Sequence, residues 1–504
     1  MRYLSKLSLL AALGVILFGM PTSANAQTIS TCDRALGEAY LDVNNVRARI
    51  LNTGGLFYRG EPHVYEVPKG SGSNAIFASG IWIAGQVGGQ LRASATRYGE
   101  WEMWAGPLDD QGNPPTDCAI YDRIYKVNRT DVEALDLTGA TTSDLVDWPT
   151  GLGAPTMDAN GDLIEILDQP FASRVDRKIN LGAGERPVLL GDQTIWWVMN
   201  DRGNQHTSTD APPIGLEVHG TAFAFDVAGD IGNATFYKFN LFYKGNVPLE
   251  ESYLTIWSDP DLGNFDDDYV GSDTSLGLGY VYNSDNVDEG GEGYGTPAPA
   301  AGYDFFQGPI VPSVATDTAY VSGRAVPGFK NLDMTTFAFF NNGGGVQGGP
   351  GDAEGYYNYM QGNWLDGKRF TFGGSGRDFS EEETNFMFTG DPATQDCWTE
   401  VNSDCLGTAI SPGDRRFAMS TGPFTINPGD QQEIVFGLVF GKGADNWDSV
   451  NALRTADALA QAAFDVNFAL PQSPARPIVN VVPGDGNVAI EWTNAPNSNN
   501  YLES

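Results

Sequence analysis

Residues 235–244 read TFYKFNLFYK, a run in which large apolar and polar side chains nearly alternate. In an extended segment, successive side chains point to opposite faces. One face of this segment would be apolar and would carry Tyr237, Phe239, Leu241 and Tyr243. The other would be more polar and would carry Lys238, Asn240 and Lys244. This alternation is typical of a half-buried β-strand.

The same strand signal recurs along the chain. Five other runs are rich in apolar, β-branched and aromatic residues: 75–85, 193–199, 253–257, 277–282 and 434–440. Glycine occurs 62 times in 504 residues, well above its usual share of about 7%, which indicates many turns. The pattern predicts an all-β fold, a large multi-stranded β-sandwich with long loops, built as one sandwich or as two packed ones.

One late helix is expected before the chain changes character. Asp448 or Ser449 can cap it, and apolar residues follow at helical spacing: Val450, Leu453, Ala456, Ala460 and Phe464. Residues 471–477 then contain three prolines and are predicted to form a linker. The sequence IVNVVPGDGNVAIEW at 478–492 resembles the first two strands of a fibronectin type III domain. Since such a domain needs about 100 residues, residues 478–504 are expected to be a truncated one.

The N-terminus predicts export. Arg2 and Lys6 precede a short apolar stretch, and Ala24-Asn25-Ala26 supplies the small residues of a cleavage site. The stretch is too short for a transmembrane anchor, because a spanning helix needs about 20 apolar residues. Residues 1–26 are therefore interpreted as a signal peptide, and residues 27–470 as a secreted ectodomain.

The charge balance excludes some partners. The chain has 64 acidic and 29 basic residues and a formal net charge of −35. Such a surface repels nucleic acid and anionic lipid, while its carboxylates suit hard cations such as Ca²⁺. Disorder is the usual consequence of strong acidity with few aromatics, but 27 Phe, 20 Tyr and 11 Trp favour large buried cores.

Four cysteines, Cys32, Cys118, Cys397 and Cys405, remain after removal of the signal peptide. They allow three pairings. A short loop closed by Cys397–Cys405 and a long one closed by Cys32–Cys118 are favoured. Metal binding is the weaker alternative, since there is no Cys-x-x-Cys pair and the expected compartment is oxidising.

An acidic loop follows Trp257. Within fifteen residues it carries six aspartates and no basic residue: Asp259, Asp261, Asp266, Asp267, Asp268 and Asp273. Clustered carboxylates repel one another, and a Ca²⁺ ion that takes 6–8 oxygen ligands would relieve the repulsion. Gly263 would permit the tight turn. The alternative is an acidic loop that is merely solvated. A second candidate, Asp158–Asp162, is equally well explained as a β-turn.

Several segments between Leu41 and Pro471 together resemble a family of large surface proteins of bacteria that use type IX secretion. They are LDVNNVRA (41–48), YEVPKGSG (65–72), IWIAG (81–85), WAGPL (104–108), YDRIYKV (121–127), WSDPDLG (257–263), DDDYVGSD (266–273), DRRF (414–417), STGPF (420–424) and PGD (428–430). Proteins of this family commonly carry fibronectin-like modules and a C-terminal sorting domain. The resemblance implies export, a partnership with the secretion machinery and display at the cell surface, but no defined biochemical activity.

Catalytic signatures are weak. The chain has only three histidines, His63, His206 and His219, and no His-Glu-x-x-His motif. We therefore expect a non-enzymatic, calcium-binding structural or adhesion protein, with no transmembrane anchor in the mature chain, that meets an extracellular surface, matrix or polysaccharide. The alternative is a carbohydrate-binding or carbohydrate-active protein. Trp101, Trp104 and Trp364 could stack on sugars, although core packing is the more common role of such residues.

Overall fold

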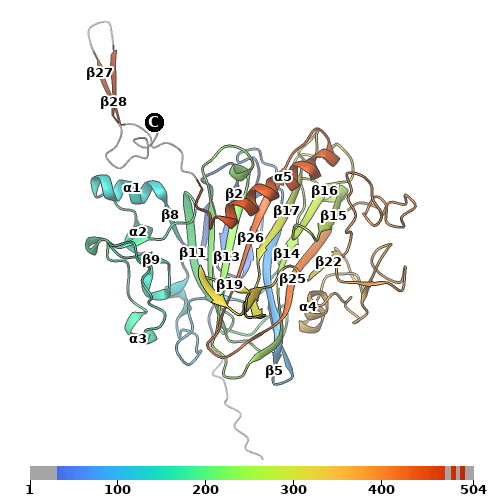
Figure 1. The fold of residues 1–504 in the computed structure, drawn as a ribbon, viewed down its shortest axis with the longest axis horizontal. Coiled ribbons are helices and arrows are strands. Elements are labelled where there is room, and N and C mark those ends of the chain that lie inside the picture. The colour runs from blue at the N-terminus through green and yellow to red at the C-terminus, as the bar shows by residue number, and fades with distance from the viewer. Residues whose placement is uncertain (1–30, 471–477, 484–487, 494–504) are drawn as a thin grey trace, which may run out of the picture.

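The computed structural model describes residues 31–470, 478–483 and 488–493. Two nine-stranded antiparallel sheets face each other (Figure 1). The first sheet runs β1-β2-β3-β5-β14-β25-β22, and β4 and β6 pair with β2 and β5. Its strands are β1 (Glu38–Leu41), β2 (Arg47–Leu51), β3 (Gly55–Leu56), β4 (Tyr65–Glu66), β5 (Ala78–Val87), β6 (Gln90–Ala95), β14 (Leu249–Asp259), β22 (Thr336–Asn341) and β25 (Arg415–Ile426).

The second sheet runs β15-β16-β17-β26-β13-β12-β11-β7, and β8 pairs with β11. Its strands are β7 (Trp104–Ala105), β8 (Tyr125–Asn128), β11 (Gln193–Asn200), β12 (Leu216–Ala224), β13 (Thr235–Tyr243), β15 (Asp268–Asp273), β16 (Leu278–Asn283), β17 (Ala300–Gln307) and β26 (Gln431–Gly441). The predicted all-β sandwich is therefore confirmed, and each of the six runs identified in the sequence contributes a strand.

Small two-stranded pairs and short helices fill the connections. The pairs are β9 (Thr156–Met157) with β10 (Arg186–Pro187), β18 (Ile310–Pro312) with β21 (Phe329–Asn331), β19 (Thr318–Val321) with β20 (Arg324–Pro327), and β23 (Phe370–Thr371) with β24 (Glu383–Thr384). The α-helices are α1 (Arg129–Thr138), α2 (Ser143–Val146), α3 (Phe171–Arg174), α4 (Ala353–Met360) and α5 (Asn446–Asp465). The 3₁₀ turns are η1 (Cys118–Tyr121), η2 (Thr150–Leu152), η3 (Leu181–Ala183), η4 (Asp230–Asn233) and η5 (Phe265–Asp267).

One hydrophobic core joins the two sheets. The apolar face of β13 points into it, and Tyr237, Phe239, Leu241 and Tyr243 are all buried. Trp82 on β5 stacks on Trp257 of β14, with ring centroids 6.1 Å apart. The opposite face of β13, which the sequence suggested would be more polar, is only partly buried and carries Lys238, Asn240 and Phe242.

Helix α5 crosses the outside of the second sheet (Figure 1) and packs on β26, β17 and β16. It begins earlier than expected, because the carboxylate of Asp445 caps it by accepting a hydrogen bond from the Asp448 amide at 2.8 Å. Its predicted apolar residues Val450, Leu453, Ala456 and Ala460 are buried. A Cβ atom at Gly441 would lie 2.2 Å from the Leu453 nitrogen, so only glycine allows β26 to approach the helix this closely.

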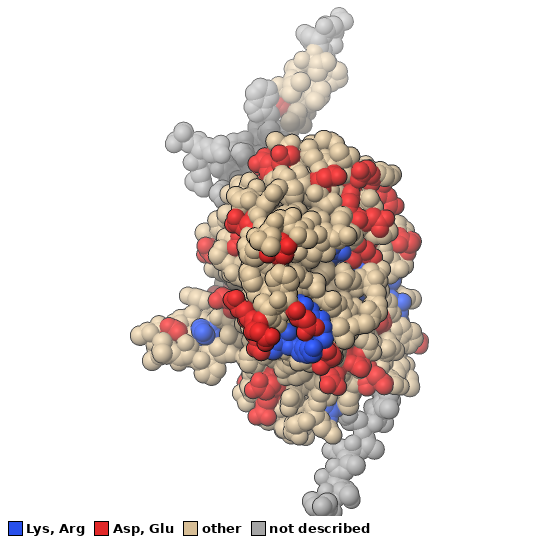
Figure 2. Space-filling model, turned by 90° about the vertical axis from the view of Figure 1, so that its right-hand side faces the viewer, with Lys and Arg blue, Asp and Glu red and all other residues tan. Residues whose placement is uncertain are grey.

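All four cysteines are paired as favoured, in the disulfides Cys32–Cys118 and Cys397–Cys405. The first packs against buried Trp104. Acidic side chains are spread over the surface, as one face shows in Figure 2.

Beyond α5, the strands β27 (Ile478–Pro483) and β28 (Val488–Thr493) pair antiparallel. This pairing agrees with the two strands expected there, while the fibronectin type III identity stays a prediction. The proposed signal peptide (1–26) and linker (471–477) lie outside the described residues. Among the residues that the structure describes, no helix is long and apolar enough to cross a membrane.

Candidate functional site

The strongest cluster of ligand atoms lies where β14 ends and β25 begins. These strands are antiparallel neighbours, with Ser258 opposite Phe417, so residues just after β14 meet residues just before β25. One carboxylate oxygen each of Asp259, Asp261 and Asp414 lies within 4.8 Å of the others. We call these three residues the Asp259 cluster.

The Asp259 cluster has an excess of negative charge. Asp259 is fully buried, and its Oδ2 accepts hydrogen bonds from the Tyr98 hydroxyl at 2.8 Å and from Arg416 Nη2 at 2.9 Å. Arg416 also contacts Asp414. Three carboxylates therefore share one guanidinium, and further positive charge at this position would be stabilising.

Some oxygens of the cluster have no donor. Oδ1 of Asp259 and Oδ1 of Asp261 are buried and accept no hydrogen bond while both groups are ionised, although a proton on Asp261 lets the two carboxyl groups hydrogen-bond to each other. Burial raises the pKa of Asp259, and burial together with the charges of Asp259 and Asp414 raises the pKa of Asp261. A buried acceptor without a partner costs about 1–3 kcal/mol, and a metal ion would satisfy both oxygens at once.

A second group of carboxylates lies in the same loop. The Asp267 cluster consists of Asp267, Asp268 and Asp288; Asp288 comes from the loop after β16. Oδ2 of Asp268 accepts from the Leu262 amide at 2.9 Å, whereas its Oδ1 and both oxygens of Asp267 are buried without a donor. Burial raises the pKa of Asp267 and Asp268, and the charge of Asp288 adds to the rise in each.

Glycine is required where the loop passes this second cluster. Gly263 has φ +70°, and a Cβ atom there would lie 2.1 Å from Oδ2 of Asp288. The tight turn that the sequence suggested at Gly263 thus brings the backbone against a carboxylate. Asp288 accepts from the Asn264 amide at 3.0 Å and from the Tyr294 amide at 2.6 Å, which fixes its side chain.

The six aspartates named from the sequence are therefore divided. Asp259 and Asp261 belong to one cluster, and Asp267 and Asp268 to the other. Asp266 is exposed, and Asp273 instead lies 3.3 Å from Arg454 Nε and accepts from Ser275. Asp414 and Asp288 lie outside the acidic loop in the sequence, and strand pairing and loop folding bring them into the two clusters. In the second sequence candidate, Asp158–Asp162, the half-exposed Asp158 accepts hydrogen bonds from the amides of Asn160 and Asp162, as in an ordinary turn.

The histidines are all engaged within the fold. His206 contacts the Ala93 and Asp201 carbonyls at 2.8 Å each. It also lies 3.3 Å from Glu102 and 3.4 Å from Thr209, but all three residues are buried and closed to a substrate. His219 contacts Glu217 at 2.7 Å, and His63 contacts Glu61 at 3.3 Å. Trp104 and Trp364 are buried core residues, whereas Trp101 is 37% exposed.

Comparison with known proteins does not assign the chain to a family. No protein-family model matches it, and no curated protein matches it.

Proposed function

We propose that this protein is a secreted, non-enzymatic structural or adhesion protein of a bacterial cell surface, and that Ca²⁺ stabilises its sandwich at the loop between β14 and β15. The observation that carries the proposal is the Asp259 cluster, whose three carboxylates lie within 4.8 Å with two oxygens unpartnered.

Calcium fits the donor set better than other common cations. All the side-chain donors are carboxylates, which favours hard cations over the thiolate- and imidazole-seeking transition metals. Ca²⁺ accepts irregular sets of 6–8 oxygens, whereas Mg²⁺ requires nearly ideal octahedral geometry. Asp259, Asp261 and Asp414 would be the protein ligands, and the ion would join the ends of two central strands.

Other features support a location outside the cell and a structural role. Two disulfides brace the N-terminal segment and the loop that follows β24, and disulfides persist in oxidising compartments. The resemblance to surface proteins of type IX secretion points the same way. His206, the histidine with a carboxylate and a hydroxyl beside it, is sealed in the core, so its contacts support packing rather than catalysis.

The proposal predicts both surface display and a calcium-dependent melting temperature. Antibodies against residues 31–470 should label intact cells of the native organism. The purified exported protein should melt at a higher temperature in millimolar Ca²⁺ than in a chelator, and equimolar Mg²⁺ should restore little of the difference. A protein found only inside the cell would refute the location, and a melting temperature indifferent to chelator would refute the calcium site.

A further inference from the structure

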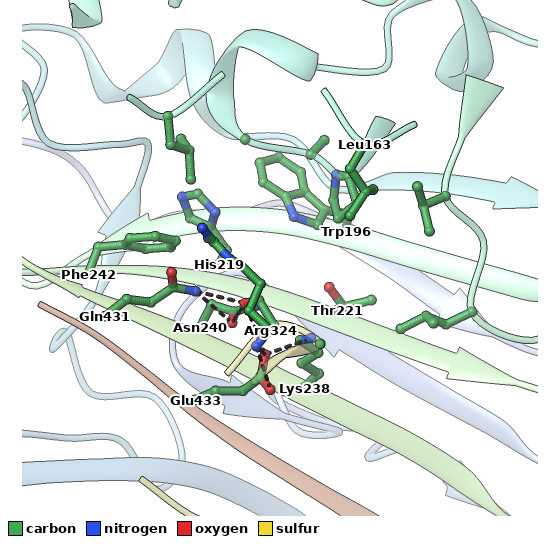
Figure 3. A pocket seen from close by; sticks show the side chains of 18 of the residues that line it. Leu163, Trp196, His219, Thr221, Lys238, Asn240, Phe242, Arg324, Gln431 and Glu433 are labelled. Carbon is green, nitrogen blue, oxygen red and sulfur yellow. Dashed lines mark hydrogen bonds and ion pairs between the residues drawn. The ribbon is translucent and has the colours of Figure 1, made fainter. Parts of the chain in front are cut away.

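A separate cavity of about 550 Å³ lies on the outer face of the second sheet (Figure 3). Its floor is formed by the central strands β11, β12, β13 and β26. Residues 153–168 form one wall, and the end of the β19–β20 hairpin, residues 320–324, forms another. The size is that of a small-molecule site, since such pockets measure about 300–1,000 Å³.

One side of the cavity is aromatic. The rings of Trp196 and His219 meet edge to face with centroids 5.4 Å apart, and those of His219 and Phe242 lie 4.5 Å apart. Trp196 is supported from behind by a buried apolar cluster that includes Trp148 and Leu152. The aromatic side is therefore held rigidly in place.

The lining carries both signs of charge, with Glu165, Asp168, Glu217 and Glu433 against Lys238, Lys244 and Arg324. Glu433 lies 2.6 Å from Lys238 Nζ and accepts from Gln307 Nε2 at 2.8 Å. Glu217 lies 2.7 Å from His219 Nε2, and its other oxygen accepts from the Leu108 amide at 2.7 Å. Both glutamates are nearly fully buried. Both carboxylates are therefore fully engaged in contacts within the protein, and the near balance of charge in the lining favours a neutral ligand.

The neutral polar side chains of the cavity, in contrast, form only some of the hydrogen bonds that they can make. Asn240 Oδ1 accepts from Ser322 Oγ at 2.9 Å and from Gln431 Nε2 at 3.2 Å, which orients its Nδ2 group. Asn240 Nδ2, Trp196 Nε1 and the Thr221 hydroxyl have no hydrogen-bond partner in the part of the chain that the structure describes. Trp196 and Thr221 are buried and Asn240 is partly buried, and all three residues line the cavity. Trp196 is paired directly with Thr221 across the sheet, so fixed donors lie beside the aromatic side.

We propose that this cavity binds a neutral pyranose unit of an extracellular polysaccharide, without hydrolysing it. A pyranose ring presents an apolar C–H face, which suits the partly exposed ring of Phe242. It also has a rim of hydroxyls that accept and donate hydrogen bonds, which suits the open groups of Asn240, Thr221 and Trp196. Hydrolysis would need two free carboxyl groups flanking the bond. Both glutamates of the floor are engaged, and the other two carboxylates of the lining, Glu165 and Asp168, lie on the same wall.

The test uses the purified exported chain and four probes: the methyl pyranosides of glucose, galactose and mannose, and methyl glucuronide as the anionic comparison. Saturation-transfer NMR detects binding, and calorimetry measures the affinity. At least one neutral probe should bind, and none should be cleaved. If no neutral probe binds, or if only the glucuronide binds, the proposal is wrong. Release of methanol from a bound pyranoside would refute its non-hydrolytic part.

Two variants connect the binding to this cavity. Thr221→Val keeps the side-chain shape and removes a hydroxyl that bonds to nothing in the described protein, so it should leave the melting temperature unchanged and weaken binding about fivefold. Phe242→Leu keeps apolar volume but removes the ring, and a similar loss is expected. Thr371→Val is the matched control, because the Thr371 hydroxyl is also unpartnered and lies outside the cavity. Equal affinity in Thr221→Val, Phe242→Leu and the parent would place the sugar elsewhere.

The cavity contains no residue of the Asp259 cluster. Sugar binding should therefore survive in Asp261→Asn, and this variant separates failure of the sugar site from failure of the calcium site.

Discussion

Asp261→Asn should have opposite effects on stability with and without Ca²⁺. Without the ion, the substitution removes one of three crowded carboxylates. One oxygen of each carboxylate lies within 4.8 Å of the others, and at that upper limit two unit charges repel by about 3.5 kcal/mol at an effective dielectric constant near 20. Two such repulsions are relieved, and the attraction to Arg416 is lost. The raised pKa of Asp261 means that protonation already relieves part of this repulsion, so we expect a net gain of only roughly 1–3 kcal/mol in chelator, larger at pH 8 than at pH 6.

With Ca²⁺ present, the same substitution removes a ligand. An ion at a hundredfold excess over its dissociation constant stabilises the parent by about 2.7 kcal/mol. Over the 440 residues from 31 to 470, an unfolding entropy of about 2.1 cal/mol/K per residue makes each kcal/mol worth about 1 °C. The parent should gain about 3 °C from Ca²⁺, whereas the variant should start 1–3 °C higher in chelator and gain less than about 1 °C.

Differential scanning calorimetry in both conditions measures the effect, with exposed Asp266→Asn as the matched control from the same loop. The control should follow the parent in Ca²⁺ and in chelator. If Asp261→Asn lowers the melting temperature equally in both conditions, the residue is an ordinary packing element and the reasoning fails.

Three further predictions concern the rest of the fold. Replacing both Cys32 and Cys118 by Ser opens a loop with a sequence separation of 86 and should lower the free energy of unfolding by about 4–5 kcal/mol in the chain-entropy model. Opening Cys397–Cys405, with a separation of 8, should lower it by only about 2–3 kcal/mol. Equal losses in denaturant titrations would contradict the loop-length argument. Glu400→Gln breaks a buried pair in which Arg415 Nη2 lies 2.7 Å from Glu400 and should lower stability by about 3–5 kcal/mol, and an unchanged denaturation midpoint would show that the pair is dispensable. Burial and the charge of Asp457 raise the pKa of Asp304, and burial and the charge of Asp273 raise the pKa of Asp457 against the opposing charge of Arg454. Because these pKa values are higher in the folded than in the unfolded chain, the two groups contribute fully to the free energy of unfolding below about pH 4, and this contribution is lost as pH rises. Asp457→Asn should therefore stabilise the protein more at pH 8 than at pH 5, and a stability difference independent of pH would refute the prediction.

Much of the fold could be predicted from the sequence because strands carry a local signal. The alternation in residues 235–244 identified both β13 and its core-facing side chains. The late helix was found from its apolar spacing, although its start was placed too late because Asp445 caps it from outside the periodic segment. Cysteine number and spacing left three pairings open, and the structure has the favoured one.

The sites depended on contacts that no local pattern contains. Asp414 joins Asp259 only because β14 and β25 pair across more than 150 residues of chain. The outer face of β13 appeared to be a polar surface, yet residues 153–168 and the β19–β20 hairpin cover it and make it the floor of a cavity. The sequence therefore indicated acidic chemistry in the right loop, but neither the complete ligand set nor the cavity.

The most direct test of the calcium site is native mass spectrometry of the exported protein after dialysis against millimolar Ca²⁺. The parent should retain bound Ca²⁺, and the double variant Asp259→Asn/Asp414→Asn should lose at least one ion while keeping both disulfides. A parent that carries no Ca²⁺, or a double variant that retains as many ions as the parent, would contradict a calcium site at the junction of β14 and β25.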